Sequence, residues 1–336
     1  MCNFPQFLYH PVKHYQVRLY QPQDFSLWNT FISFAKNATF LFHRNFMDYH
    51  SDRFEDYSLI VLDGEKVVAV LPANRVGDTV YSHQGLTYGG LVLNKKAKLS
   101  AVISIFKCVL EYLNENSIDK LTVKNVPNFY SDFFSEELEY CLFILNSRLY
   151  RKDALSVIDL SKDFFLDNNR MEGVKKGMKK ELIIKEETTF DLFWNEILIP
   201  NLELKHQAKP VHSLSEITKL KNYFPNNIRQ FNVYEKDVLI AGTTIFVNNN
   251  VVHSQYISGN ETKKITGSLD YLFHHLIMEV FKDKNFFDFG TSNESEGRKM
   301  NLGLLFWKES FGAKTVVQNF YEVETKNYSI LEAVLL

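Results

Sequence analysis

The sequence predicts an α/β (α+β) protein of two tandem domains, each a mixed, mostly antiparallel sheet flanked by helices. Three observations predict this fold. The chain has 336 residues, which fits two domains of about 100–200 residues each. Apolar runs joined by Asp63-Gly64-Glu65 form a hairpin pattern, and a second pair is joined by Glu235-Lys236-Asp237. The elements around these hairpins follow the same order in both halves.

The two halves align without a gap. A shift of 171 positions places Val67 on Val238, Val80 on Val251, and Gln84 on Gln255. Few identities are involved, so the shared order of elements carries the argument. We infer an internal duplication, with an N-terminal domain at 1–160, a C-terminal domain at 161–336, and a basic helical linker at about 162–180.

Each element of the first half follows from its local pattern. Helices are expected where apolar residues recur at helical spacing, as Phe25, Trp28 and Ile32 do, and strands where apolar runs end at turn residues. The expected strands are 14–20, the hairpin within 60–70, 79–84, 120–125 and 149–159, and the expected helices are 24–36, 100–114 and 135–145.

The second half repeats these patterns. The expected strands are 181–186, 228–235, 238–246, 251–257, 286–290 and 314–323. The expected helices are 189–198, 213–223, one beginning near Ser268, and 300–310.

Composition limits the classes of function. Hydrophobic residues make up 45% and charged residues 23%, so both domains can bury sizeable cores. The net charge of −2 argues against broad attraction to DNA or to anionic membranes. The three cysteines (Cys2, Cys108, Cys141) lack metal-ligand spacing, so we expect free thiols and no metal. The N-terminus is not a signal peptide and no run could span a bilayer, which predicts a soluble cytoplasmic protein.

The C-terminal segment carries a more specific pattern. Asp288-Phe289-Gly290 ends a strand, Gly303 follows, and Trp307-Lys308 and Phe311-Gly312 precede the last strand. This segment resembles the closing segment of the FemAB-like family, whose members contain two tandem GNAT (N-acetyltransferase-like) domains. The basic stretch 170–180 is similar to the helix that joins the halves in that family.

The resemblance implies an acceptor side in the first domain and a donor side in the second. Some members transfer amino acids from aminoacyl-tRNA to peptidoglycan precursors, and others resemble acyl-CoA-dependent N-acyltransferases. This chain lacks the long charged helical insertion of several tRNA-using members. We therefore expect acyl transfer from acyl-CoA, such as acetyl-CoA, to an amine of a sugar, nucleotide sugar or amino-acid-derived acceptor. Two alternatives stay open: an aminoacyl-tRNA-dependent ligase of peptidoglycan precursors, and a non-catalytic binding protein.

Catalytic candidates lie on or beside the strands expected to part in the second half. Lys308 matches the family's lysine, and its helix is expected to pack Leu304, Leu305 and Trp307 toward the core while the ammonium faces a cleft. Such an ammonium can stabilise an oxyanion, although a surface ion pair with Asp288 or Glu294 is the alternative. The full candidate set is Lys308, Asp288, Glu294, Tyr256 and His253.

The donor's phosphates are expected at the loop 259–268, because the N-terminus of the following helix offers unpaired N–H groups. Ser268 is the expected N-cap, and Asp270 in the first turn opposes phosphate binding. An ordinary solvated turn is the alternative. The cofactor-binding candidates are Gln255, Ser258, Lys263, Lys264, Gly267 and Ser268.

Acceptor contacts are expected from two segments of the first half. One lies within 43–50, for which a surface helix is the alternative, and the other is the glycine-bearing loop 83–90, for which a plain turn is the alternative. The substrate-binding candidates are His43, Arg44, His83, Gln84 and Tyr88. A lysine stripe at Lys175, Lys176, Lys179 and Lys180 fits either a solvated face or phosphate contact.

Overall fold

The computed structural model describes residues 13–335, without the side chains of 205 and 206, and Cys2 lies outside this range. The chain divides into two compact units. Unit 1 consists of two segments of the chain, one ending at Tyr150 and one beginning at Asn319, and unit 2 is Arg151–Gln318. The single boundary expected at 160/161 differs from this division. The reason is that two long strands, β9 (Arg148–Asp159) and β17 (Lys314–Glu324), each begin in one unit and end in the other.

Unit 1 contains two groups of paired strands. The first is antiparallel, in the order β1-β3-β4-β7, and in the second β6 and β8 run parallel within the order β17-β8-β6-β5-β2. The strands are β1 (Gln16–Leu19), β2 (Glu55–Asp56), β3 (Leu59–Asp63), β4 (Lys66–Leu71), β5 (Asn74–Val76), β6 (Thr79–Tyr81), β7 (Val92–Leu93) and β8 (Lys120–Lys124).

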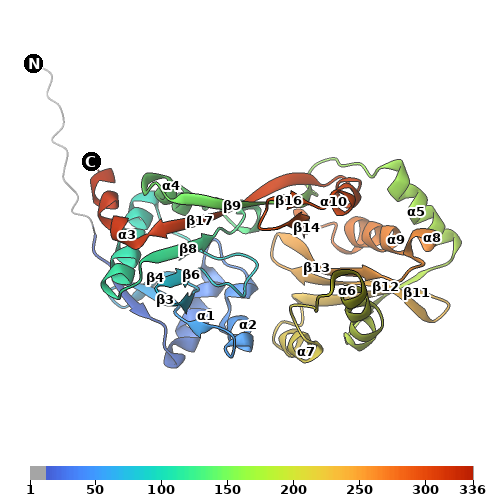
Figure 1. Ribbon diagram of the computed structural model, residues 1–336, viewed down its shortest axis with the longest axis horizontal. Helices are drawn as coiled ribbons and strands as arrows, with labels where there is room; N and C mark the ends of the chain where they lie inside the picture. The colour runs from blue at the N-terminus through green and yellow to red at the C-terminus, as the bar shows by residue number, and fades with distance from the viewer. Residues whose placement is uncertain (1–12, 336) are drawn as a thin grey trace, which may run out of the picture. The chain divides into compact units, whose positions relative to one another are not determined.

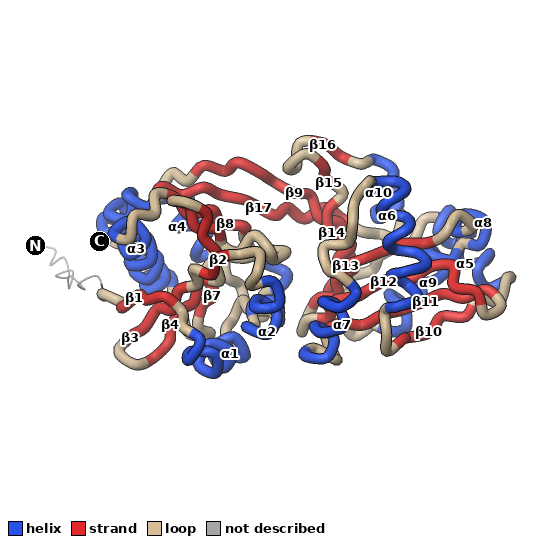
Figure 2. Tube along the Cα trace, turned by 60° about the horizontal axis from the view of Figure 1, so that its bottom comes forward, coloured by secondary structure: helices blue, strands red, loops and turns tan. Residues whose placement is uncertain are grey.

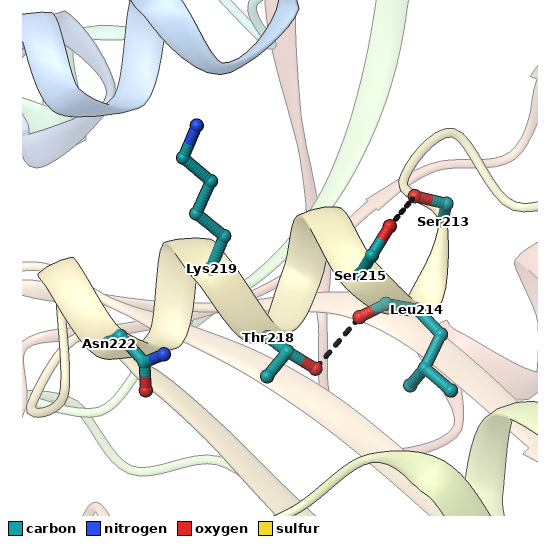
Figure 3. Close-up of a pocket in the computed structure, with 6 residues that line it drawn as sticks. All are labelled: Ser213, Leu214, Ser215, Thr218, Lys219 and Asn222. Carbon is teal, nitrogen blue, oxygen red and sulfur yellow. Dashed lines mark hydrogen bonds between the residues drawn. The ribbon is translucent and has the colours of Figure 1, made fainter.

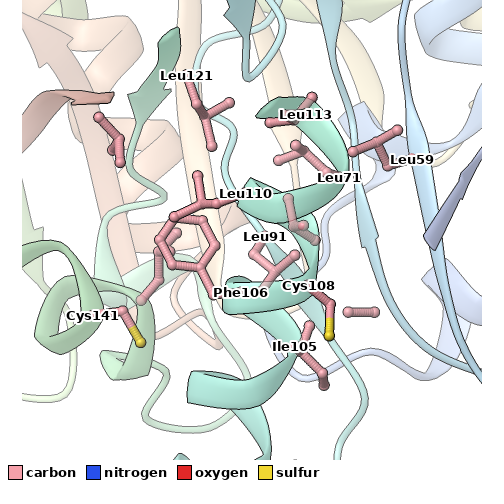
Figure 4. Packing of buried hydrophobic residues seen from close by; sticks show 14 of the residues in the cluster. Leu59, Leu71, Leu91, Ile105, Phe106, Cys108, Leu110, Leu113, Leu121 and Cys141 are labelled. Atoms are coloured by element: carbon pink, nitrogen blue, oxygen red, sulfur yellow. The ribbon is translucent and has the colours of Figure 1, made fainter. Parts of the chain in front are cut away.

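The α-helices of unit 1 are α1 (Phe25–Phe34), α2 (Arg44–Met47), α3 (Leu99–Glu115) and α4 (Glu137–Ile144). Its 3-10 helices are η1 (Pro22–Asp24), η2 (Phe40–Phe42), η3 (Asp48–His50), η4 (Asn128–Tyr130) and η7 (Thr325–Val334). The long helix α3 supplies much of the core, and Figure 4 shows its buried face with Ile105, Phe106, Leu110 and Leu113 among leucines of the strands. The expected helix at 100–114 is therefore confirmed, because its apolar residues recur at helical spacing.

Unit 2 has one mixed sheet in the order β10-β11-β12-β13-β14-β9, in which only β13 and β14 are parallel. The strands are β10 (Ile183–Glu187), β11 (Ile228–Glu235), β12 (Val238–Val247), β13 (Val251–Gly259) and β14 (Phe286–Thr291), with a small hairpin of β15 (Asn293–Glu294) and β16 (Lys299–Met300). The expected strands at 228–235 and 286–290 are confirmed.

Helices cover both faces of this sheet (Figures 1 and 2). On one side α5, α8 and α9 gather together, and on the other the π-helical turn η5 leads into α6 and then α7. The helices are α5 (Asn168–Lys179), η5 (Phe193–Leu198), α6 (Ile199–His206), α7 (Leu214–Tyr223), α8 (Lys263–Thr266), α9 (Ser268–His275), its π-helical extension η6 (Leu276–Val280), and α10 (Leu302–Glu309). Within residues 13–335 no helix combines the length and apolar character needed to cross a membrane.

The strand pairings of the two units repeat, as the inferred duplication requires. In unit 1 β1, β3 and β4 pair antiparallel, as β10, β11 and β12 do in unit 2. In unit 1 β6 is parallel to β8, which is antiparallel to β17, and in unit 2 β13 is parallel to β14, which is antiparallel to β9. In unit 1 the strand next to β8 is β17, whose chain arrives from unit 2, and in unit 2 the strand next to β14 is β9, whose chain arrives from unit 1.

A close contact between two glycines packs α5 against the start of α9. Gly267 has φ +66°, and a Cβ atom there would lie 2.1 Å from the Gly173 carbonyl oxygen. A Cβ atom at Gly173 would in turn lie 1.9 Å from Asp270 Oδ2. The basic segment expected as a linker is therefore a helix packed within unit 2.

Gly267→Ala tests this contact. A side chain at a positive φ and against backbone should cost about 2–4 kcal/mol of unit 2 stability. Gly303→Ala is the matched control, because its nearest neighbour would be 3.7 Å from the new Cβ in α10, and we expect it to stay within about 1 kcal/mol of wild type. Hydrogen exchange of unit 2 amides in urea measures both; equal stabilities would contradict the role of the glycine contact.

Candidate active site at the parting of β13 and β14

The parallel strands β13 and β14 pair over a short length and then separate. Their register runs from Val251 opposite Phe286 to His253 opposite Asp288. Beyond this point β13 continues to Gly259, paired with β12. In a mixed sheet, the place where parallel strands part exposes side chains and backbone groups that a ligand can reach.

A backbone irregularity in β14 begins where the strands part. The register of β14 with β9 shifts between Asp288 and Thr291. Gly290 within this shift has φ +68°, a conformation that glycine adopts without strain. The N–H of Gly290 donates to Asp288 Oδ1 at 2.7 Å. A Cβ atom at position 290 would lie 3.2 Å from Cε1 of His253, so a larger residue would press on the imidazole.

His253 and Asp288 form a hydrogen-bonded pair across the two strands. The distance from His253 Nδ1 to Asp288 Oδ2 is 2.9 Å. Because a carboxylate accepts only, Nδ1 carries the proton in this pair, and the neutral imidazole keeps its lone pair on Nε2. The side chain of Asp288 is 2% exposed and that of His253 13%, so the imidazole is the more accessible partner. The two residues therefore have the geometry of an oriented general base.

Lys308 donates hydrogen bonds to backbone carbonyl groups at the same irregularity of β14. Its Nζ donates to the carbonyl oxygens of Gly290 at 3.0 Å and Thr291 at 2.7 Å. Burial lowers the pKa of Lys308 to about 8, while the nearby charge of Asp288 acts in the opposite direction. The residue is 2% exposed. The ammonium has three N–H groups, of which the two carbonyls engage two.

The packing expected for the helix of Lys308 is partly wrong. Trp307 does pack into an aromatic cluster with Phe273, Phe289 and Phe311, as expected. Leu304, however, is 39% exposed, and Lys308 is the buried residue of α10. The physical reason is that the two carbonyl groups of the β14 irregularity need donors, and the ammonium supplies them.

Two other catalytic candidates have different surroundings. Tyr256 is buried beside Trp194, and its hydroxyl lies 2.6 Å from His212 Nδ1. Burial raises the pKa of Tyr256 to about 12, so the phenol stays protonated and serves as a hydrogen-bonding group rather than a base. Glu294 is exposed in β15 and accepts from the Asn301 side chain, and no described contact joins it to Lys308. His212 was not anticipated from sequence, since only tertiary packing brings it to Tyr256.

The N-terminus of α9 differs from the expected phosphate cradle. Gly267, not Ser268, occupies the N-cap position, and Ser268 is fully buried under the glycine contact with α5. Asp270 accepts from Arg170 Nη1 at 2.5 Å and from the Trp307 indole at 3.2 Å. The first turn of α9 is thus covered, and a phosphate cannot reach Gly267 or Ser268 in this arrangement.

The remaining cofactor candidates lie along β13 and on α8. Ser258 is buried and accepts from the Asn201 side chain at 2.9 Å. Gln255 lies at an irregularity of β13, and its buried Oε1 has no hydrogen-bond partner among the described residues. Lys264 is exposed and Lys263 half-buried on α8, which contacts the lysine-bearing α5. Only the tertiary structure brings these two lysine-bearing helices into contact.

The substrate-binding candidates of unit 1 serve structural contacts. Arg44 is buried between Asp48, Asp56 and Ser58, so the surface helix considered for this segment is wrong.

Burial lowers the pKa of His83 to about 3, so it is neutral, and its ring stacks on that of buried His50 with 5.0 Å between centroids. Tyr88 is buried and donates to Thr39 at 3.0 Å. His43 accepts from the Asn45 N–H at the start of α2, and Gln84 exchanges two hydrogen bonds with Asn74. These residues hold unit 1 together, and their roles as acceptor contacts stay predictions.

A surface hollow of about 740 Å³ lies over α7 (Figure 3). Its lining comes from one helix and its cap: Ser213, Leu214, Ser215, Thr218, Lys219 and Asn222. Figure 3 shows the Ser213 and Thr218 hydroxyls engaged in local hydrogen bonds. The hollow contains none of the candidate site residues.

The lowered pKa of Lys308 predicts that the free energy of unfolding depends on pH. Its folded-state pKa of about 8 lies below the ordinary value of 10.5. Between these values the unfolded chain binds more protons, so the contribution of Lys308 to folding stability rises with pH in this window. The difference in unfolding free energy between wild type and Lys308→Met should therefore change with pH from about 8 to 10.5. Urea unfolding at a series of pH values measures it, and a pH-independent difference would contradict the shifted pKa.

Comparison with known proteins identifies the fold. No family model matches the chain, and no curated protein matches its sequence. Among solved structures, FemX is 9% identical with a TM-score of 0.66, over 94% of this chain and 99% of that one. The structure of L-PGS from Bacillus licheniformis is 11% identical with a TM-score of 0.60, over 95% and 98%. A tandem GNAT protein from the clavulanic acid biosynthesis pathway is 11% identical with a TM-score of 0.52, over 93% and 99%. The chain therefore has the tandem GNAT fold that these proteins share, as its C-terminal pattern predicted.

Proposed function

We propose that this chain is an N-acyltransferase that moves an acyl group from acyl-CoA to an amine of a sugar, nucleotide sugar or amino-acid-derived acceptor. The observation that carries the proposal is the group His253, Asp288 and Lys308 at the parting of β13 and β14. The fold shared with FemX and with a tandem GNAT protein supports a transferase. The resemblance and the shared fold support the reaction class, and the geometry supports the roles that we propose for the residues.

His253 is suited to remove the proton that the acceptor amine loses when it attacks a thioester. Asp288 holds the imidazole in the tautomer whose Nε2 accepts a proton, and it stabilises the imidazolium that results. When the tetrahedral intermediate collapses, the C–S bond breaks and the departing CoA thiolate takes up that proton. The Gly290 N–H bond to Asp288 fixes the orientation of the carboxylate. The base is therefore oriented by contacts that exist before any substrate binds.

Lys308 is suited to stabilise the oxyanion of the tetrahedral intermediate. Its ammonium is buried, and interactions of a charge with a developing oxyanion are stronger where water is excluded. The carbonyls of Gly290 and Thr291 hold the ammonium in place and engage two of its three N–H groups. In the proposed mechanism the third N–H donates to the substrate oxygen.

Unit 1 lacks this group at the matching place, which supports unit 2 as the catalytic unit. In unit 1 Val80 lies opposite Leu121, as Val251 lies opposite Phe286 in unit 2. Two positions farther along each strand, unit 2 has His253 and Asp288, whereas unit 1 has Ser82 and Val123. A serine and a valine cannot form an oriented base.

For the donor, lysines of α8 and α5 are the phosphate contacts we propose. Because Gly267 and Ser268 are covered, the positive charge near the α9 terminus comes from Lys263 and Lys264, together with the exposed stripe of α5. Phosphate groups of acyl-CoA are attracted by such a group of ammonium ions.

An aminoacyl-tRNA-dependent ligase is the second candidate, and the likeness to FemX favours it. The first turn of α9 also favours the ligase. This turn carries Asp270 and is covered by α5, so it offers no open helix N-terminus to the pyrophosphate of CoA. A non-catalytic binding protein would not need an oriented base such as His253 near Lys308, so this group counts against the third candidate. Donor binding distinguishes these candidates.

Replacement of Lys308 tests the catalytic assignment. Lys308→Met should lower kcat on the order of 10²-fold or more with little change in donor affinity, because the interaction forms mainly in the transition state. Transfer of labelled acyl groups to a panel of amines measures kcat, and circular dichroism checks folding. If the folded variant keeps near-normal turnover, the lysine only supports β14.

Replacement of the α8 lysines tests the donor site. Lys263→Ala/Lys264→Ala should weaken acetyl-CoA binding at least about tenfold, through the loss of two charge contacts with phosphate. The control is Lys95→Ala/Lys96→Ala, an exposed lysine pair of unit 1. Isothermal titration calorimetry measures both. Equal affinity in all three proteins argues against the α8 contacts, and a wild type that binds no CoA but binds aminoacyl-tRNA replaces the proposal with the second candidate.

A further inference from the structure

Three metal-ligating side chains of unit 1 meet beside α3, one of them exposed, one buried in the core and one half-buried. They are His14, Cys108 and Glu111, and their ligand atoms all lie within 4.8 Å of one another. The distance from His14 Nδ1 to Cys108 Sγ is 3.9 Å. Residues 13–335 hold no other group of three His, Cys, Asp or Glu side chains whose ligand atoms come this close.

The local structure explains why these residues meet. Cys108 and Glu111 are three positions apart on α3, which places them on one face of the helix. His14 lies two residues before β1, which pairs with β3 at the edge of the sheet. The backbone N–H of Tyr15 donates to Cys108 Sγ at 3.5 Å. This hydrogen bond holds the backbone next to His14 beside the thiol.

We propose that His14, Cys108 and Glu111 form a Zn²⁺ site with three protein ligands and a fourth position open to water. Imidazole, thiolate and carboxylate are the ligand types that zinc takes in proteins. Ligand atoms about 2.0–2.3 Å from a tetrahedral zinc lie roughly 3.3–3.6 Å apart. The present separations are somewhat larger, so binding requires the three groups to close on the ion. His14 is exposed, and its flank of the site gives the ion a path from solvent.

The charges around the site allow Glu111 to serve a metal. Lys107 Nζ lies 3.2 Å from Glu111 Oε2 and 2.8 Å from Glu332 Oε1. When zinc takes the Glu111 carboxylate, Lys107 keeps Glu332 as its partner, so no ammonium is left unpaired. The Tyr15 N–H stabilises the Cys108 thiolate that zinc requires.

Zinc binding at this site releases the thiol proton. Burial raises the pKa of Cys108, so the thiol is protonated near neutral pH in the metal-free protein. The affinity should therefore rise with pH. The bound ion would join the segment entering β1 to α3, independently of any transfer reaction in unit 2.

Cobalt titration of the full chain tests the site. A Cys2→Ser background removes a thiol outside the described residues, and after treatment with a chelator Co²⁺ is added as the spectroscopic probe. A near-ultraviolet thiolate-to-cobalt band, with the visible bands of a four-coordinate ion and one Co²⁺ per chain, is the expected result. Excess Zn²⁺ should abolish both sets of bands.

The variants separate this site from other thiols. His14→Ala should weaken Co²⁺ binding at least about tenfold, while Glu115→Gln, an exposed carboxylate one turn along α3, should leave it unchanged. Cys108→Ser should remove the thiolate band although Cys141 (Figure 4) remains. Because Cys108 belongs to the core and its loss can unfold unit 1, the exposed His14 provides the deciding variant. The absence of a thiolate band in the parent, or unchanged affinity in His14→Ala, would overturn the proposal.

Discussion

The interaction between the Lys308 ammonium and the carbonyls of Gly290 and Thr291 is the constraint on which the candidate active site depends. At this place the register of β14 with β9 shifts, and two backbone carbonyls of the irregularity accept from Lys308. Unpaired carbonyls in a protein interior are costly, and so is a buried ammonium. The contact reduces both costs, and the lowered pKa of Lys308 shows that part of the cost of burying the ammonium remains. The same irregularity turns the Gly290 N–H toward Asp288, which orients His253.

A second constraint is the contact between two glycines that covers the N-terminus of α9 in unit 2. The glycine contact between α5 and α9 brings the backbones close, and Asp270 then finds Arg170 and Trp307 as partners. This packing covers the helix terminus where the GNAT fold is expected to bind pyrophosphate. It also packs α5 against α8, two lysine-bearing helices some ninety positions apart in sequence. The charge of this region therefore results from packing and not from any single loop.

Much of the fold could be predicted because it rests on local patterns. The hairpin turns at Gly64 and Lys236 and the apolar spacing of α3 each act over a few residues. The repeat also survives at the level of strand pairing. The passage of β9 and β17 from one unit into the other could not be predicted, because the partner of a strand depends on which sheet edge is available in the folded protein.

The tandem α/β architecture and the candidates Lys308, Asp288 and His253 could be inferred from the sequence alone, because turn residues, periodicity and the C-terminal pattern are local features of the chain. The use of these side chains depends on the folded structure. It buried Lys308 against carbonyls, made Gly267 rather than Ser268 the N-cap, and placed His14 beside Cys108. The physical reason is that hydrogen-bond partners and burial come from segments distant in sequence, and no local pattern records them.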